Sequence, residues 1–273
     1  MKYLSIIILL SAQSAFCQNI RNFETKFDWK TVEKKPFTEQ DLANLFPTIK
    51  DQPFRTLEAA KNSLSLFHFV DYNNDGEDDI FYNGWSGGEG TMLLVITSTG
   101  TYKIDQYFSG RVQNIKMDNG NIKSIEILDY SCCAGYVDHL QLLNFDNSTN
   151  QFLKVNDYAI ITGTPIPTDF FEPIKFSITN EFYNLRTDPE IQKMKNGTVP
   201  FDPIKEQNIS AVYTAGDTGT AIAAKTDSTG RIWWFVIMDD KPISETIFYD
   251  GNNDFETYQP VGWLSSRFVK KVE

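Results

Sequence analysis

Short runs of strand-forming residues recur along most of this chain, separated by turn-forming residues. Runs at 112–117 and 122–128 are joined by Asp-Asn-Gly-Asn at 118–121, a strong β-hairpin signal. Runs at 137–145 and 152–158 are joined by a second polar stretch. Successive hairpins predict an antiparallel meander. We therefore predict that the fold is mostly all-β.

Helix signals are confined to a stretch before the first strands. Thr38 can cap a helix start, with Asp41 three residues further on. A short helix is predicted from there to about Leu45, ended by Pro47. Residues 56–63 are expected to form a second short helical turn.

The chain divides most readily at 163–168, where Gly-Thr-Pro-Ile-Pro-Thr interrupts the strand pattern. Its 273 residues suffice for two domains, and 41% hydrophobic residues can supply their cores. We predict a β-rich domain at 18–162, a linker at 163–174 and a second domain at 175–273.

Residues 1–17 have the features of a secretory signal peptide. Lys2 is followed by an apolar run at 4–10, and Ala15 and Cys17 are small residues before the expected cleavage point. The apolar run is too short to span a membrane. The alternative is a lipoprotein acylated on Cys17, but Phe16 is bulky where that signal has a small residue. We expect an exported protein, periplasmic or extracellular, that begins at Gln18 and has no transmembrane segment.

Acidic residues outnumber basic ones by 36 to 25, which gives a formal net charge of −11. A chain without a basic field does not offset phosphate repulsion. The composition therefore disfavours nucleic acid and anionic membrane surfaces as partners.

An acidic loop is flanked by strand-like runs at 65–70 and 79–82. Alternate oxygen-bearing side chains in a tight loop can converge on a hard cation such as Ca²⁺, and Gly76 permits the sharp turn. The predicted metal ligands are Asp71, Asn73, Asp75, Glu77 through its backbone carbonyl, and Asp79. Tyr82 stands where an EF-hand has its bidentate glutamate, so this is not a complete EF-hand loop. The alternative is a solvated acidic turn without metal.

The segment Phe69-Val70-Asp71-x-Asn73-x-Asp75-Gly76-x-x-Asp79-Ile80 resembles the repeat core of FG-GAP/VCBS β-propeller proteins. The resemblance covers about 20 residues and implies Ca²⁺ bound between two strands. The chain carries one clear loop of this kind, whereas a propeller needs several blades, so a whole propeller is not expected.

Three segments of the C-terminal part resemble the bacterial SH3-like (SH3b) domain. They are Tyr183-Asn184-Leu185-Arg186-Thr187-Asp188-Pro189, Gly230-Arg231-Ile232-Trp233-Trp234-Phe235-Val236, and Gly262-Trp263-Leu264-Ser265-Ser266-Arg267-Phe268-Val269. The resemblance implies a small β-barrel that serves as a targeting or ligand-binding module, often for cell-wall peptides. Residues 196–207 look like an insertion between the first two segments.

Aromatic residues in these segments are candidates for a ligand groove. They are Tyr183, Trp233, Trp234 and Trp263. Because alternate residues of a strand point to opposite faces, at least one of Trp233 and Trp234 is expected in the core. We expect Trp263 to pack against one of them.

Possible catalytic groups give no recognisable site. Asp217-Thr218-Gly219 is the tripeptide of aspartic proteases, but pairing two carboxylates needs a second copy. Cys133 and His139 are six residues apart, a spacing that seldom yields a nucleophile with its base. His68 is expected to be a core or edge residue. We predict no catalytic residue.

Two further features have open interpretations. Cys132 and Cys133 are adjacent, and form either a vicinal disulfide or two buried thiols. The acidic loop at 250–256 is irregular in spacing and is interpreted as a solvated turn.

The function expected from these patterns is non-catalytic binding at the bacterial cell envelope, stabilised by calcium. A cell-wall peptide or an envelope protein is the expected partner. The alternative is an envelope hydrolase, or its accessory subunit, with an unrecognised site.

Overall fold

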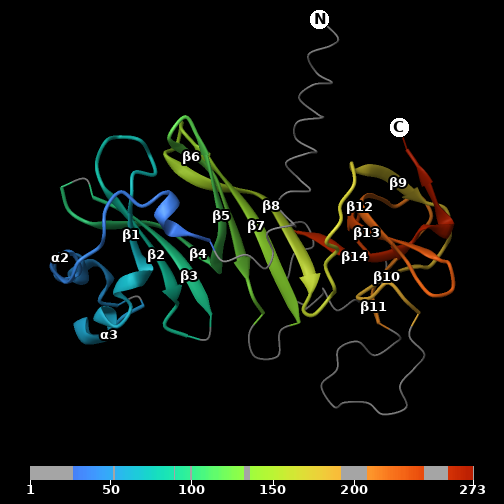
Figure 1. Ribbon diagram of the computed structural model, residues 1–273, viewed down its shortest axis with the longest axis horizontal. Helices are drawn as coiled ribbons and strands as arrows, with labels where there is room; N and C mark the ends of the chain where they lie inside the picture. The colour runs from blue at the N-terminus through green and yellow to red at the C-terminus, as the bar shows by residue number, and fades with distance from the viewer. Residues whose placement is uncertain are drawn as a thin grey trace, which may run out of the picture. The chain divides into compact units, whose positions relative to one another are not determined.

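The computed structural model describes residues 27–51, 53–88, 90–98, 100–131, 136–191, 208–242 and 258–272. The predicted signal peptide, the adjacent cysteines at 132 and 133, the proposed insertion at 196–207 and the acidic loop at 250–256 lie outside these ranges. Most described elements are strands in antiparallel sheets, which confirms the all-β class (Figure 1).

The described residues fall into two compact units. The N-terminal unit comprises residues 27–131 and 140–155, and the C-terminal unit comprises 136–139 and 156–272. No described helix is long and apolar enough to cross a lipid bilayer.

Two groups of sequential strands build the N-terminal unit. The first four form one antiparallel sheet in chain order, and the next four follow each other in the same consecutive way. The strands are β1 (Phe67–Val70), β2 (Asp79–Trp85), β3 (Thr91–Thr97), β4 (Lys103–Ser109), β5 (Arg111–Asp118), β6 (Asn121–Asp129), β7 (Val137–Asp146) and β8 (Gln151–Ile161), the last two contributing their residues 140–155 to this unit.

Strands β1, β2 and β3 are buried on both faces of their sheet. Phe67 and Leu94 belong to a core shared with the helices, whereas Phe81 and Leu93 belong to a core shared with β5 and β6. Because successive side chains point to opposite faces, a strand buried on both sides is apolar throughout. This explains the continuous apolar sequence of β3.

Helix α2 (Glu39–Ile49) begins where the sequence predicts. Thr38 accepts a hydrogen bond from the backbone N–H of Asp41, whose carboxylate in turn accepts from the backbone N–H of Thr38 at 2.9 Å. The predicted end at Pro47 is wrong, because the helix continues to Ile49. Ile49 is fully buried, and this burial holds the last turn although Pro47 removes one backbone hydrogen bond. The second helix, α3 (Leu57–Lys61), lies within the predicted helical turn.

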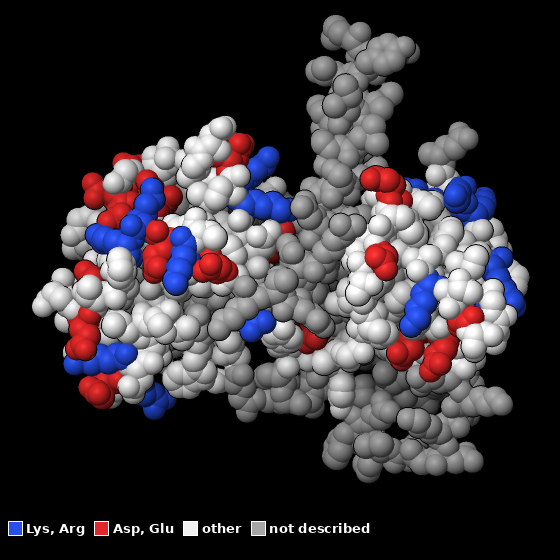
Figure 2. All heavy atoms as spheres, viewed as in Figure 1, with Lys and Arg blue, Asp and Glu red and all other residues white. Residues whose placement is uncertain are grey.

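The hairpin between β5 and β6 has the predicted turn. Asp118 pairs with Asn121, and the two residues between them, Asn119 and Gly120, have φ angles of 52° and 87°. Positive φ at both central positions is typical of a type I′ turn. On the face drawn in Figure 2, acidic and basic side chains are interspersed over this unit.

The C-terminal unit contains a three-stranded meander, β12-β13-β14. β9 pairs with β12 and β15 with β9, while β10 pairs with β14 and β11 with β10. A 3₁₀ turn, η3 (Ser266–Phe268), separates the last two strands. The strands are β9 (Ile174–Ile178), β10 (Tyr183–Arg186), β11 (Ile209–Tyr213), β12 (Thr218–Thr226), β13 (Ile232–Met238), β14 (Gln259–Ser265) and β15 (Val269–Lys271).

The described strands of this unit do not close into the expected barrel. β11 pairs only with β10, and β15 only with β9, so the path of hydrogen-bonded strands has two open ends within the described residues. Sequence motifs specify individual strands, whereas closure depends on pairing between strands far apart in the chain.

The segment before β9 is held against this unit. Residues 158–160 of β8 pair in parallel with β14, and the indole N–H of Trp263 donates to the carbonyl of Pro165 at 3.0 Å. Phe171 donates its backbone N–H to Ile222 at 3.0 Å. Residues 163–174 are therefore tied to the C-terminal unit, while the predicted domain limits at 162 and 175 remain predictions.

Candidate metal centre

The acidic loop joins β1 to β2, as the sequence predicts. Val70 and Asp79 are antiparallel partners, so the loop 71–78 returns the chain to the same end of the sheet. Asn74 and Gly76 have φ angles of 57° and 88°. A Cβ at Gly76 would meet nothing within 4 Å, so the left-handed backbone rather than space favours glycine here.

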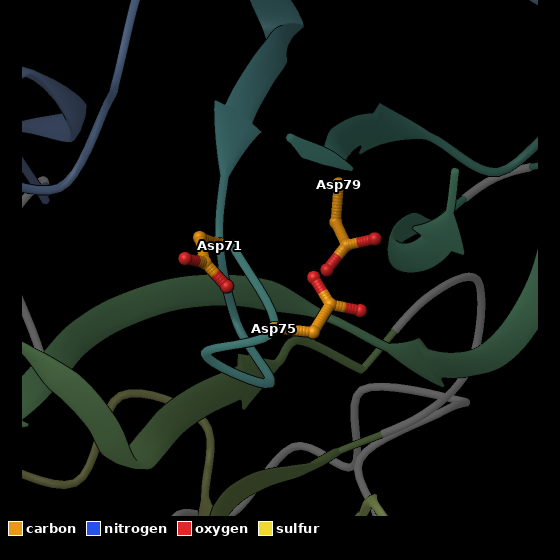
Figure 3. A group of neighbouring side chains, drawn as sticks. All are labelled: Asp71, Asp75 and Asp79. Carbon is orange, nitrogen blue, oxygen red and sulfur yellow. The ribbon is translucent and has the colours of Figure 1, made fainter. Parts of the chain in front are cut away.

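Three of the predicted ligands come together at this loop. One carboxylate oxygen from each of Asp71, Asp75 and Asp79 lies within 4.8 Å of the others. The carboxylates of Asp75 and Asp79 face one another, with Asp71 across the loop (Figure 3). Asp75 is exposed, Asp71 is half-buried and Asp79 is fully buried, so the cluster extends from solvent into the protein.

Asp79 is the buried end of the cluster. Its Oδ1 accepts a hydrogen bond from the backbone N–H of Ser98 at 3.1 Å. Burial raises the pKa of Asp79 to about 7, and the charges of Asp75 and Asp71 add to the increase, while the Ser98 N–H opposes it. The carboxylate is therefore held where its charge is poorly compensated by the protein.

Two carboxylate oxygens in the cluster have no partner. Asp79 Oδ2 and Asp71 Oδ1 are both buried and accept no hydrogen bond. Buried polar atoms are normally satisfied, and an uncompensated buried carboxylate is unfavourable. A cation between these side chains would partner both oxygens and reduce their mutual repulsion. The residues present thus fit a bound cation.

The other predicted ligands have different local roles. Asn73 donates its side-chain N–H to Asp75 Oδ2 at 2.9 Å and accepts at Oδ1 from the backbone N–H of Asp75 at 3.1 Å. The backbone N–H of Glu77 donates to Asp75 Oδ1 at 2.8 Å. These bonds fix the side chain of Asp75 before any ion binds. The side chain of Glu77 is exposed.

The neighbouring Asp78 is drawn away from the cluster. Its Oδ2 lies 2.6 Å from Lys35 Nζ, and the ammonium of Lys35 lies 4.4 Å from the ring centroid of Phe69. The three clustered carboxylates offer only oxygen ligands, which hard divalent cations prefer.

The aromatic candidates of the C-terminal unit differ in exposure. Trp233 and Trp263 are 1% and 2% exposed, whereas Tyr183 and Trp234 are half-buried. The expectation that at least one of Trp233 and Trp234 lies in the core is confirmed. The ring in contact with Trp263 is Phe235, at a centroid distance of 5.1 Å.

Both histidines pair with carboxylates. His68 Nδ1 lies 3.2 Å from Glu33 Oε1, and His139 Nδ1 lies 2.9 Å from Asp157 Oδ1. Cys133, considered with His139, lies outside the described residues. Asp217 accepts the backbone N–H of Thr214 at 2.7 Å within a turn. In the described part of the chain, no serine, threonine or cysteine side chain is hydrogen-bonded to either histidine.

Sequence reasoning missed three polar side chains that share a cavity with Tyr183 and Trp233. They are Arg186, Arg231 and Ser265. Each lies inside one of the SH3b-like segments, and this position was the only sequence signal for it. The ligand-groove prediction considered aromatic residues alone and therefore did not include these polar ones. Comparison with protein-family models, with curated proteins and with solved structures gave no match.

Proposed function

We propose that this chain is an exported, non-catalytic binding protein of the bacterial cell envelope. In this proposal a calcium ion stabilises the loop between β1 and β2, and the C-terminal unit carries the ligand-binding surface. The expected ligand is a cell-wall peptide or another envelope component.

The juxtaposition of the three SH3b-like segments carries the binding role. They contribute β10, β13, and β14 with η3, which are neighbours in one sheet. Arg186 pairs with Trp263, and Trp233 pairs with Ser265. Gly262 permits this arrangement, because a Cβ there would lie 2.8 Å from the carbonyl oxygen of Arg186. Segments far apart in the chain thus lie side by side in one sheet.

The unpartnered oxygens of Asp71 and Asp79 support the proposal of a bound metal ion. Ca²⁺ accepts six to eight oxygen ligands in flexible geometry, so three carboxylates with loop carbonyls and water suit it. Carboxylates on one loop repel each other until an ion neutralises them. In the proposed role the ion stiffens the N-terminal unit and takes no part in chemistry.

The test is retention of the full-length chain on purified peptidoglycan, with Ca²⁺ and with a chelator. We expect retention of the wild type, weakened by Tyr183→Ala. The matched control is Tyr107→Ala, which removes an exposed tyrosine of the N-terminal unit. Circular dichroism verifies that both variants are folded. A folded wild type that passes through the peptidoglycan column would overturn the binding role.

A further inference from the structure

A cavity of about 200 Å³ in the C-terminal unit collects positive charge, although the chain as a whole carries −11. Three arginines line it, Arg186, Arg231 and Arg267, together with Tyr183, Trp233 and Ser265. Arg267 is exposed, whereas Arg186 is only 6% exposed. The cavity therefore has a buried cationic wall.

Arg186 lies close enough to Arg231 for the two positive charges to repel each other. Burial lowers the pKa of Arg186, and the positive charge of Arg231 lowers it further. Arg186 donates from Nη1 to the side-chain oxygen of Asn208 at 2.8 Å, a neutral acceptor. Two neighbouring cations repel each other, and an anion bound beside both would reduce this repulsion.

Donors in this cavity are left unused. Arg231 Nε and Ser265 Oγ are buried and have no hydrogen-bond partner, and Ser265 as a whole is 8% exposed. The guanidinium of Arg231 lies 5.5 Å from the ring centroid of Trp233. Among the described residues, no carboxylate lies within ion-pair distance of Arg231.

Asp227, the acidic residue nearest to Arg231 in the sequence, uses its carboxylate for hydrogen bonds within its own turn. Asp227 Oδ1 accepts the backbone N–H of Thr229 at 2.8 Å and that of Arg231 at 3.1 Å. Its Oδ2 accepts the indole N–H of Trp233 at 2.9 Å. Asp227 thus shapes the backbone beside the cavity and uses its carboxylate there.

We propose that this cavity binds the terminal carboxylate of a peptide, held by the guanidinium groups of Arg186 and Arg231 and by the hydroxyl of Ser265. Arginine offers paired donors that match the two oxygens of a carboxylate. Ser265 Oγ can donate to the same anion. The rings of Tyr183 and Trp233 provide an apolar wall for the last side chain of the peptide. The inference rests on the proposed function, and it names the chemical group that the C-terminal unit recognises.

Size and charge favour a single end group over a polyanion. Pockets for drug-sized ligands are about 300–1,000 Å³, so a cavity of about 200 Å³ takes one terminal residue. The negative net charge repels a long phosphate polymer more strongly than one carboxylate.

The test is calorimetric titration of the full-length chain with N-acetyl-dialanine, in its L,L and D,D forms. The corresponding C-terminal amides and inorganic phosphate are titrated in parallel. We expect one of the free acids to bind, and its amide to bind about tenfold more weakly or worse, because the amide forfeits the charge-assisted hydrogen bonds. Equal binding of acid and amide, or binding of phosphate alone, would overturn the assignment.

Variants separate recognition from folding. Arg231→Gln should weaken binding of the free acid about tenfold or more, whereas Arg55→Gln, the same change on an exposed arginine of the N-terminal unit, should have no effect. Ser265→Ala should weaken binding about fivefold without lowering the melting temperature, since its hydroxyl has no partner to lose. If Arg231→Gln binds as the wild type does, the proposal fails.

The same variants are applied to peptidoglycan, which distinguishes this inference from the proposed function. Retention that is equal in wild type and Arg231→Gln, together with no binding of the free acids, rejects the carboxylate pocket and leaves envelope binding in place. Binding of a free acid without retention on peptidoglycan supports the pocket and rejects the envelope assignment.

Discussion

Replacing Asp79 with asparagine should stabilise the metal-free protein and should remove much of its response to calcium. The carboxylate of Asp79 is fully buried, and burial raises its pKa from 3.8 to about 7. The unfolded chain therefore releases this proton at a lower pH than the folded chain does. Stability falls as the pH rises from about 4 to 7, and the full penalty is present above pH 7.

The size of the effect follows from the difference between the two pKa values. About three pH units at 1.36 kcal/mol each correspond to about 4 kcal/mol above pH 7. Asparagine has nearly the same shape and no charge, and its carbonyl oxygen can still accept from the Ser98 N–H. In the presence of chelator, we expect the free energy of unfolding of Asp79→Asn to exceed that of the wild type by up to about 4 kcal/mol at pH 8 and by about 2 kcal/mol at pH 5.

Calcium should reduce the difference in stability between Asp79→Asn and the wild type, or reverse its sign. At a hundredfold excess over Kd, a ligand that binds only the folded state contributes about 2.7 kcal/mol. The wild type offers three carboxylates to the ion and the variant offers two, so the variant should gain less. The measurement is urea unfolding at pH 5 and pH 8, with Ca²⁺ and with chelator. Amide hydrogen exchange of β1 and β2 then locates the change in the loop hairpin.

Asp78→Asn is the matched control for this experiment. Asp78 is adjacent in sequence but forms an ion pair with Lys35 and lies outside the cluster. The Asp78→Asn variant should lose no more than about 1 kcal/mol of unfolding free energy, which is typical of an exposed ion pair. Calcium should stabilise it as it stabilises the wild type. Equal responses to calcium in the wild type and Asp79→Asn, or a less stable variant in chelator, would refute the reasoning.

Three further outcomes are expected. Trp263→Ala should destabilise the C-terminal unit by about 3–5 kcal/mol, measured by denaturant unfolding, because the ring is 2% exposed and contacts Phe235; a loss below about 1 kcal/mol would contradict its core role. A fragment of residues 156–273 should melt at a higher temperature than one of 175–273, since the shorter fragment lacks the strand paired with β14 and the carbonyl that binds Trp263; equal melting would show that these contacts contribute nothing. N-terminal sequencing should show that the exported protein begins at or near Gln18, and a lipid on Cys17 would contradict this.

Local signals in the sequence predicted the elements that depend on few residues. The Asn119-Gly120 turn and the Thr38 cap are each determined by backbone preferences within four residues, and both form as expected. The acidic loop is similar, because alternate side chains of one turn converge whatever the remainder of the chain does. Pro47 gave the wrong helix end because the burial of Ile49, a tertiary effect, outweighs a local rule.

Features that depend on distant strands were not predictable in the same way. Closure of the C-terminal sheet depends on which strands pair, and the described ends, β11 and β15, do not pair with each other. Trp263 contacts Phe235 because the two residues are partners across β13 and β14. The register of strands separated by more than 20 residues has no signature in either strand alone.

The cationic cavity illustrates why polar sites are harder to find than cores. Arg186 and Arg231 are 45 residues apart, and each taken singly is an ordinary charged residue in a polar context. They become neighbours only because β10 and β13 both pair with β14, one near its end and one along its length. The buried charge of Arg186 then lies close to that of Arg231, whose Nε is buried and has no hydrogen-bond partner. A carboxylate bound beside both groups would accept hydrogen bonds from the unpartnered Arg231 Nε and Ser265 Oγ and would reduce the repulsion between the two arginines, which is the physical reason to look for the ligand among carboxylates.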